Sequence, residues 1–227
     1  MDRGAWLRER RDAVVRTYDG EGPTYDEVID PIQPMHVGFI DRLLATTPPD
    51  GVVLDVPCGT GRYFEFVTRA GRRVVGADQS AGMLASAEAK GLATALHRVG
   101  LQEMRFDGEF DATMTIDSIE NVPPEDWPTV LANLRRAVRP GGHHYLTVEE
   151  IDQAEIDAGF AAGSAAGLPI VPGEVIEGDV AGYHFYPGRD RALAWFADAG
   201  LEVVAEDRNW QGDYGYRHYL LRPAGRA

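Results

Sequence analysis

Strand-like and helix-like segments alternate between residues 52 and 150, and this alternation limits the possible folds more than any other feature of the chain. Five short runs have the length and composition of strands: residues 52–56, 73–77, 94–99, 110–117 and 143–150. Helical patterns lie between them, and Ser80, for example, is suited to begin a helix that Gly91 ends. Buried strands separated by helices are typical of a parallel sheet that is covered on both faces. We therefore expect an α/β, Rossmann-like fold.

The alternation breaks after residue 150. Residues 150–188 are rich in Gly, Ala and Pro, with a possible strand or hairpin at 174–186. A helix and two further strands follow, and the connection between these two strands is too short to hold a crossover helix. We expect them to pair antiparallel, so that one of them inserts into the parallel sheet. The result is a seven-stranded, mostly parallel sheet with an antiparallel last strand.

The composition excludes several classes of function. The formal net charge is −14 and no cluster of Lys and Arg stands out, so we expect no nucleic-acid partner. Cys58 is the only cysteine, which leaves no disulfide and no multi-cysteine metal site. No apolar stretch approaches the roughly 18–20 residues that cross a bilayer, and the N-terminus has no signal-peptide pattern. We expect a soluble, cytoplasmic protein that binds neither a membrane nor a metal.

The segment VVLDVPCGTGRYF places an acid and two glycines where a strand ends. Gly59 and Gly61 would let the backbone pass close to a ligand, and Asp55 could hold this loop or accept a hydrogen bond from a ligand amine. The next strand ends in Asp78, which can accept hydrogen bonds from both hydroxyls of a ribose. A dinucleotide-binding loop needs glycine or alanine where this chain has Phe64. We therefore expect a nucleoside ligand without a diphosphate.

Four motifs, in this order, resemble those of class I S-adenosylmethionine-dependent methyltransferases of the small-molecule type: LDVPCGTGRY, the acid in VVGADQS, IDSIENVP, and LRRAVRPGGHHYLTVEE. The resemblance implies S-adenosyl-L-methionine as the cofactor and a single methyltransferase domain over residues 1–227. Its implied parts are an N-terminal helical lid (1–47), a cofactor-binding core (50–149), a substrate-side insertion (150–188), and a closing helix with antiparallel strands (189–224).

The same resemblance implies which residues contact the cofactor. The glycine loop would approach the methionine part, the acid of the second strand would bind the ribose, and the end of the fourth strand would face the sulfonium. The implied contacts are Tyr25, Asp55, Pro57, Gly59, Gly61, Asp78, Gln79, Met83, Gly100, Leu101, Gln102, Asp117 and Ser118. Two positions depart from the family pattern: Pro57 replaces a glycine, and Gln102 lies where an acid often binds the adenine amine.

Methyl transfer to a hydroxyl or an amine can need a general base, and three residues outside the cofactor motifs are candidates. His184 lies in the aromatic-rich segment AGYHFYPG of the insertion, although it could instead cap or pack a hairpin. His36 lies ahead of the first strand, where this family often places a lid helix, although it could instead be a surface or helix-start residue. Glu120 follows the fourth strand and could instead cap the helix that begins near Pro123.

The function that these features predict is methyl transfer from S-adenosylmethionine to an oxygen or nitrogen of a small organic metabolite. Two alternatives stay open from the sequence. One is a non-catalytic S-adenosylmethionine-binding partner subunit, and the other is a nicotinamide-dependent oxidoreductase. The expected partner is a small-molecule substrate, and the sequence leaves the oligomeric state undetermined.

Overall fold

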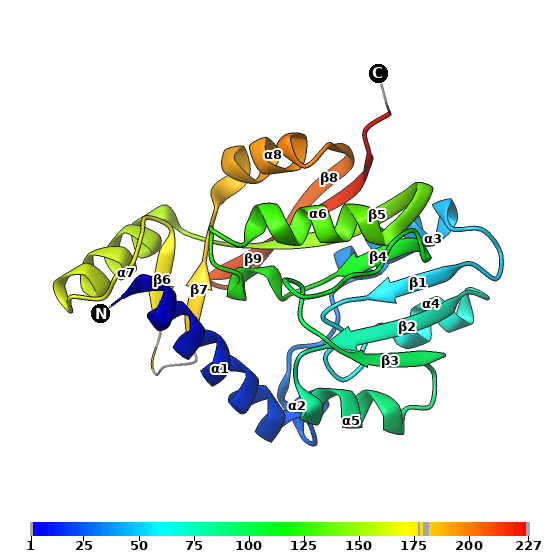
Figure 1. The fold of residues 1–227 in the computed structure, drawn as a ribbon, viewed down its shortest axis with the longest axis horizontal. Coiled ribbons are helices and arrows are strands. Elements are labelled where there is room, and N and C mark those ends of the chain that lie inside the picture. Colours follow the sequence, from blue (N-terminus) through cyan, green and yellow to red (C-terminus); the bar gives the residue numbers. More distant parts are fainter. Residues whose placement is uncertain (1, 177, 179–181, 226–227) are drawn as a thin grey trace.

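The computed structural model describes residues 2–176, 178 and 182–225, and its centre is one seven-stranded sheet (Figure 1). The strand order is β3-β2-β1-β4-β5-β9-β8. The strands are β1 Val52–Asp55, β2 Arg73–Asp78, β3 Ala95–Arg98, β4 Phe110–Thr115, β5 Val138–Ile151, β8 Leu201–Gln211 and β9 Tyr214–Pro223. Strands β1 to β5 pair in parallel, whereas β9 lies antiparallel between β5 and β8. The predicted fold class is confirmed, including the strand that inserts into the parallel sheet.

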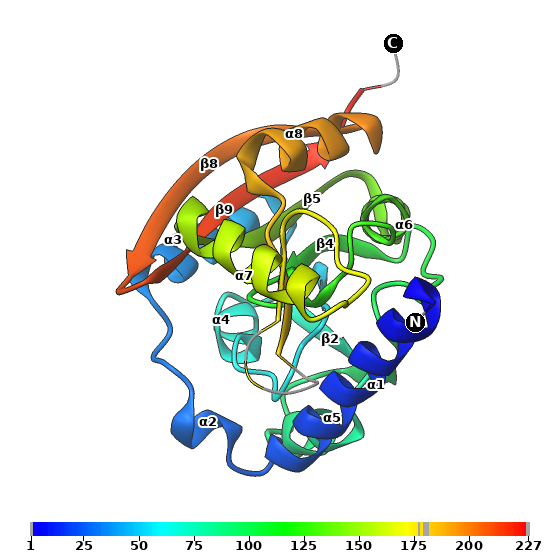
Figure 2. The ribbon, with the colours of Figure 1, turned by 90° about the vertical axis from the view of Figure 1, so that its left-hand side faces the viewer.

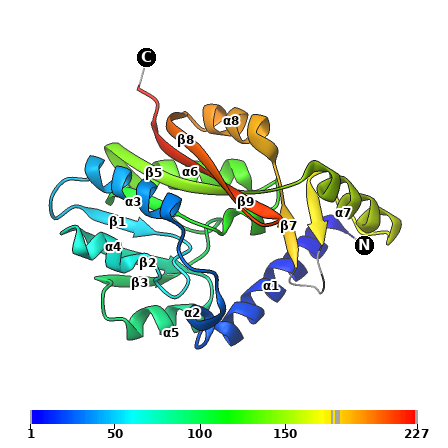
Figure 3. The same ribbon diagram turned by 180° about the vertical axis from the view of Figure 1, so that it is seen from behind.

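Helices cover both faces of the sheet. They are α1 Arg3–Glu21, α2 Tyr25–Val28, α3 Pro34–Thr46, α4 Phe64–Arg69, α5 Ala81–Ala89, the 3₁₀ turn η1 Ile119–Asn121, α6 Trp127–Ala137, α7 Gln153–Ala165 and α8 Gly188–Asp198. Successive strand residues point to opposite faces, so Leu54 joins the core beneath α6 and α8, and Val53 joins the core beneath α3 and α4 (Figures 1 and 3). Both side chains are fully buried. Of the helices that the structure describes, none is long and apolar enough to cross a lipid bilayer.

The segment after β5 contains a helix, α7, and a two-stranded hairpin (Figure 2). The hairpin strands are β6 Glu174–Ile176 and β7 Tyr183–Phe185, and they pair antiparallel as predicted, although residues 177 and 179–181 of that prediction lie outside the described residues. Helix α7 was not predicted, because its glycines lower helix propensity. The structure gives the reason for two of them: a Cβ on Gly159 would lie 2.6 Å from Val175, and one on Gly163 would lie 2.8 Å from Ile170.

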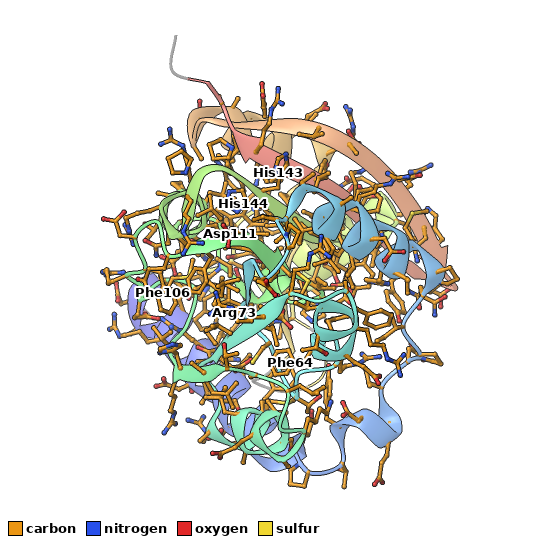
Figure 4. All side chains as sticks on the ribbon, turned by 90° about the vertical axis from the view of Figure 1, so that its right-hand side faces the viewer. Phe64, Arg73, Phe106, Asp111, His143 and His144 are labelled. Atoms are coloured by element: carbon orange, nitrogen blue, oxygen red, sulfur yellow. The ribbon has the colours of Figure 1, made fainter. Side chains whose placement is uncertain are left out.

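The end of the sheet at which the parallel strands begin is held by polar side chains (Figure 4). Asp111 accepts a hydrogen bond from the backbone N–H of Val52 at 2.8 Å and pairs with Arg139 at 2.6 Å. His144 is buried with its Nδ1 2.7 Å from the Thr113 hydroxyl, and burial lowers its pKa to about 3. Over the described residues, no group of three or more His, Cys, Asp or Glu could hold a metal ion.

Candidate cofactor and substrate site

A pocket opens at the other end of the sheet, where β1, β2 and β4 terminate and where parallel sheets place their ligands. Helix α1 lies across this end and α2 lies beside it (Figures 1 and 2). Most of the predicted cofactor contacts line the pocket: Tyr25, Pro57, Gly59, Asp78, Gln79, Met83, Asp117 and Ser118. The pocket is further lined by Val14, Val15, Tyr18, Cys58, Thr60, Arg62, Tyr63, Ser80, Ile116 and Asn121.

The loop between β1 and α4 has two glycines in the left-handed region, with different roles. Gly59 has a φ of 51°, and a Cβ there would stand in open space beside the pocket. Gly61 has a φ of 74°, and its Cβ would lie 2.5 Å from the ring of Phe64. Glycine at 59 therefore leaves bare backbone toward a ligand, whereas glycine at 61 makes room for a buried side chain and does not line the pocket.

Two buried acids stand where β1 and β2 end. Asp78 accepts hydrogen bonds from the backbone N–H groups of Gly59 (2.9 Å) and Ser80 (2.8 Å), and burial raises its pKa. Asp55 is 1% exposed, and neither of its carboxylate oxygens has a hydrogen-bond partner among the described residues. Burial and the neighbouring charge of Asp78 raise the pKa of Asp55 well above its ordinary value. A cation bound nearby would lower the cost of both charges.

A second pocket adjoins the first and contains the predicted adenine contacts Gly100, Leu101 and Gln102. The two pockets share walls, formed by Val14, Pro57, Gln79, Ser118 and Asn121. The predicted cofactor residues therefore occupy one continuous region at the strand ends, with Asp55 buried behind it.

Helix α1 is fastened over this region by polar contacts to the core. Asp19 Oδ1 accepts hydrogen bonds from the Ser80 hydroxyl at 2.7 Å and from the Gly82 backbone N–H at 3.0 Å, at the start of α5. Arg11 donates to the side chain of Gln79 at 3.1 Å and pairs with Glu103. The N-terminal segment thus forms a wall of the pocket.

Residues 53–142 match the sequence profile of the methyltransferase domain family. Ubiquinone biosynthesis O-methyltransferase from Hahella chejuensis is 30% identical over 147 residues, which cover 62% of this chain and 59% of that protein. An uncharacterized methyltransferase from Synechocystis is 28% identical over 138 residues, which cover 57% of this chain and 64% of that protein. The chain therefore spans less than two thirds of the length of these relatives.

Two solved structures are similar in fold. One is 1,6-didemethyltoxoflavin-N1-methyltransferase from Burkholderia thailandensis with bound 1,6-didemethyltoxoflavin and S-adenosylhomocysteine, at a TM-score of 0.74 and 16% identity over 99% of this chain and 92% of that chain. The other is magnesium protoporphyrin IX methyltransferase from Synechocystis with bound S-adenosylhomocysteine, at a TM-score of 0.63 and 15% identity over 92% of this chain and 99% of that chain. The family match covers the core strands of this same fold.

Residues 53–142 therefore carry a methyltransferase domain, and the chain resembles the class I S-adenosylmethionine-dependent methyltransferases. This confirms the predicted family and its cofactor over the nicotinamide-dependent alternative. The residues of this methyltransferase also fit that cofactor, because S-adenosylmethionine carries a sulfonium cation and an ammonium group. Asp55 and Asp78 are buried acids with raised pKa values, so a cation bound nearby would favour their charged forms, and Gly59 supplies backbone without a side chain beside the pocket that such a ligand would occupy.

The three candidate bases lie in two clusters. His36 is 2% exposed, and its Nε2 lies 3.0 Å from Oδ1 of Asp117, a pocket residue. His36 is therefore not a surface residue, although it does lie in the first turn of α3, which begins at Pro34. Glu120 and His184 belong to the second cluster, together with Glu149 at the end of β5.

The second cluster holds two carboxyl groups close together. Glu149 Oε2 lies 3.2 Å from Nδ1 of His184, and the Tyr186 hydroxyl lies 3.0 Å from the same nitrogen. Glu120 is buried in η1, and burial with the charge of Glu149 raises its pKa to about 8. Glu120 is therefore protonated near neutral pH. It does not cap α6, which begins at Trp127.

Sequence reasoning missed two residues of this region. Glu149 was detectable, because it stands at the carboxyl end of a predicted parallel strand, as do Asp55, Asp78 and Asp117. Tyr63 lines the pocket and donates to Asp117 at 3.2 Å, but no sequence signal separates it from an ordinary core tyrosine.

Proposed function

We propose that this methyltransferase transfers the methyl group of S-adenosylmethionine to an oxygen or a nitrogen of a small organic molecule. The observation that carries the proposal is the buried carboxyl group of Asp55, which has no hydrogen-bond partner among the described residues and stands behind a pocket that Asp78 and Gly59 line. The relatives support both kinds of acceptor atom, since one is named for O-methylation and a fold neighbour for N1-methylation.

The residues of the site would have different roles in binding the cofactor and aligning the substrate. The cofactor supplies a methyl group activated by the positive sulfur. Asp78 would hold the ribose, and the positive charge of the cofactor would favour the ionised forms of Asp55 and Asp78. Helix α1 and Tyr18 would close over the ligand and exclude water, which aids alignment of the two reactants.

Tyrosines in the pocket wall support a flat organic acceptor. Tyr18, Tyr25 and Tyr63 line the pocket, and Tyr18 and Tyr25 meet edge to face at 6.0 Å. Aromatic walls with a few polar groups are common in pockets for small organic ligands. A net charge of −14 also supports a metabolite over a nucleic acid as the substrate.

Isothermal titration calorimetry with S-adenosylmethionine, S-adenosylhomocysteine and NAD tests the cofactor. We expect the first two to bind and NAD not to bind; tight binding of NAD alone would refute the proposal. Incubation with methyl-labelled cofactor and a metabolite library then separates an enzyme from a non-catalytic binding subunit. The enzyme transfers label to at least one small molecule, whereas a binding subunit transfers none.

A further inference from the structure

We infer that His36 accepts the proton released in methyl transfer, that Asp117 positions it, and that the acceptor is consequently a hydroxyl or a ring N–H compound. This inference rests on the proposed function and deepens it. It selects one of the three candidate bases and, with it, a class of substrate that must lose a proton when it is methylated.

Asp117 is held in one orientation. Its Oδ1 lies 3.0 Å from Nε2 of His36 and accepts a hydrogen bond from the Thr147 hydroxyl at 3.2 Å, while its Oδ2 accepts one from the Tyr63 hydroxyl at 3.2 Å. The backbone N–H of Asp117 donates to the same threonine at 2.7 Å. Asp117 also has a φ of 49°, a conformation that is unfavourable for a non-glycine residue and that such contacts maintain.

This arrangement fixes the proton of His36. A carboxylate can only accept, so the hydrogen faces Asp117 on Nε2 and leaves a lone pair on Nδ1. Nδ1 is buried and has no hydrogen-bond partner among the described residues. A buried acceptor without a partner is costly, and the O–H or N–H of a bound substrate would satisfy it. An acid that orients a catalytic histidine in this way is known from hydrolytic triads.

The surroundings of His36 favour a transient positive charge. Asp117 faces it from the end of β4 and Tyr63 from the loop before α4, and Tyr216 and His218 face it from β9. Burial, with the neighbouring His36, lowers the pKa of His218 to about 4, so His218 is neutral at physiological pH. Burial raises the pKa of Tyr216 well above its ordinary value, so it stays neutral too. The carboxylate of Asp117 is thus the one charge in this set.

In this reaction His36 takes the proton that the acceptor loses. The acceptor's oxygen or nitrogen forms a bond to the methyl carbon, the carbon–sulfur bond breaks, and its electron pair stays on sulfur. The acceptor's proton passes to Nδ1 of His36, and Asp117 stabilises the imidazolium until the proton is released to water. A carboxylate or thiolate acceptor has no proton to give and would gain nothing from this pair.

None of the three candidate bases lines the cofactor pocket itself, but Asp117, the hydrogen-bond partner of His36, does line it. Glu120 also carries its proton near neutral pH and so is a poor acceptor. The roles of Glu120 and His184 as general bases stay predictions.

Nitrogen-15 NMR of histidine-labelled protein with S-adenosylhomocysteine tests the assignment without any acceptor. The His36 signals, assigned by their loss in His36→Gln, should show a protonated Nε2 and an unprotonated Nδ1 at pH 8. Asp117→Asn should shift the populations of these two forms. A proton on Nδ1 of the unaltered protein at pH 8 would overturn the inference, because that nitrogen could not accept another.

The second test is a methyl-transfer assay with labelled cofactor. Catechol, dihydroxybenzoate and N–H pyrimidine-diones are the acceptors that need a base, and thiophenol is the control acceptor that needs none. His36→Gln should slow transfer to hydroxyl or N–H acceptors about a hundredfold. It should also abolish the decline of the rate at low pH, with affinity for S-adenosylhomocysteine within about twofold of the parent. His97→Gln, an exposed histidine on β3, is the matched control and should change nothing.

The outcomes separate this inference from the proposed function. A His36→Gln variant that binds S-adenosylhomocysteine and transfers at the parent rate would overturn the role of His36 alone. Absence of S-adenosylhomocysteine binding in the unaltered protein would overturn the proposed function first. If none of these acceptors is methylated, the NMR measurement still decides the protonation of His36.

Discussion

At the scale of single residues, this methyltransferase concentrates buried acids at one end of its sheet. Asp55, Asp78, Glu120 and Glu149 are each at most 9% exposed, and burial raises the pKa of the first three. Buried acids without a counter-charge cost stability, so their presence together points to ligands that carry positive charge or donate hydrogen bonds.

Asp78→Ala should weaken binding of S-adenosylhomocysteine by about 1–3 kcal/mol, because the hydrogen bonds that the ribose hydroxyls donate to the buried carboxylate are lost. The same change frees the backbone N–H of Gly59, which further loosens the glycine loop. Calorimetry on the variant measures the affinity. The matched control is Asp107→Ala, at an exposed acid, and should bind like the parent. Unchanged affinity in a folded Asp78→Ala protein would contradict the ribose assignment.

Glu120→Gln should raise stability, and more so at high pH than at low pH. The folded pKa of Glu120 lies near 8, above its ordinary 4.5, so the folded state binds this proton more tightly than the unfolded state does. The parent therefore loses stability as the pH rises from about 4.5 to about 8, whereas the glutamine variant avoids this loss. The gain should reach a few kcal/mol at most at pH 8 and nearly vanish at pH 4.5.

Urea unfolding at pH 4.5, 6, 7 and 8.5 measures this difference, because the midpoint follows the free energy of unfolding at constant slope. Glu88→Gln, an exposed residue of α5, removes the same charge without burial and serves as the control. Parallel pH profiles for the parent and Glu120→Gln would show that the glutamate is not protonated in the folded state.

At the scale of elements, a buried ion pair joins helix α1 to strand β6. Arg3, at the start of α1, donates to Glu174 of β6 at 2.7 Å and pairs with Glu125. Glu174 is completely buried and also accepts from the Tyr183 hydroxyl at 2.6 Å. The N-terminal helix and the hairpin of the insertion are therefore packed together as one structure beside the pocket.

Arg3→Met should lower the free energy of unfolding by about 3 kcal/mol, because it leaves the buried carboxylate of Glu174 without its cation. Adding Glu174→Gln to Arg3→Met should recover part of this loss. Arg16→Met, at an exposed arginine of the same helix, should have little effect. Chemical unfolding of the parent and these three variants measures the free energies of unfolding. Equal losses for Arg3→Met and Arg16→Met would show that the buried pair of Arg3 and Glu174 does not stabilise the fold.

Sequence reasoning reached the sheet and the strand-end residues because both follow from local rules. Residues close together in the sequence are enough to predict the strand and helix periods, the terminal glycines and the acids at strand ends. The contact between His36 and Asp117 cannot be predicted in this way, because it joins α3 to the end of β4, which are far apart in the sequence. Helix α7 was missed for a related reason: its glycines are explained only by the side chains that pack against them.

At the scale of the whole molecule, segments distant in the sequence surround one pocket. Helix α1 lines it with Tyr18, α2 with Tyr25, and the loop between β1 and α4 with Tyr63. Behind these parts, the Tyr214 hydroxyl of the β8–β9 hairpin donates to Asp30 ahead of α3 at 2.7 Å. A bound ligand would touch several of these parts at once. Binding is therefore expected to stabilise the fold as a unit.

S-adenosylhomocysteine at a hundred times its Kd should stabilise the protein by about 2.7 kcal/mol, because a ligand that binds only the folded state shifts unfolding by mass action. For a chain of this size, that gain corresponds to a rise in Tm of roughly 5–11 °C. Differential scanning calorimetry measures the rise, with NAD at the same concentration as the control that should leave Tm unchanged. The rise should be smaller in Asp78→Ala at equal ligand concentration, since the weaker complex is less populated. An equal rise with NAD would mean that the pocket accepts any adenine nucleoside, and the absence of a diphosphate-binding glycine at Phe64 would then have no bearing on ligand choice.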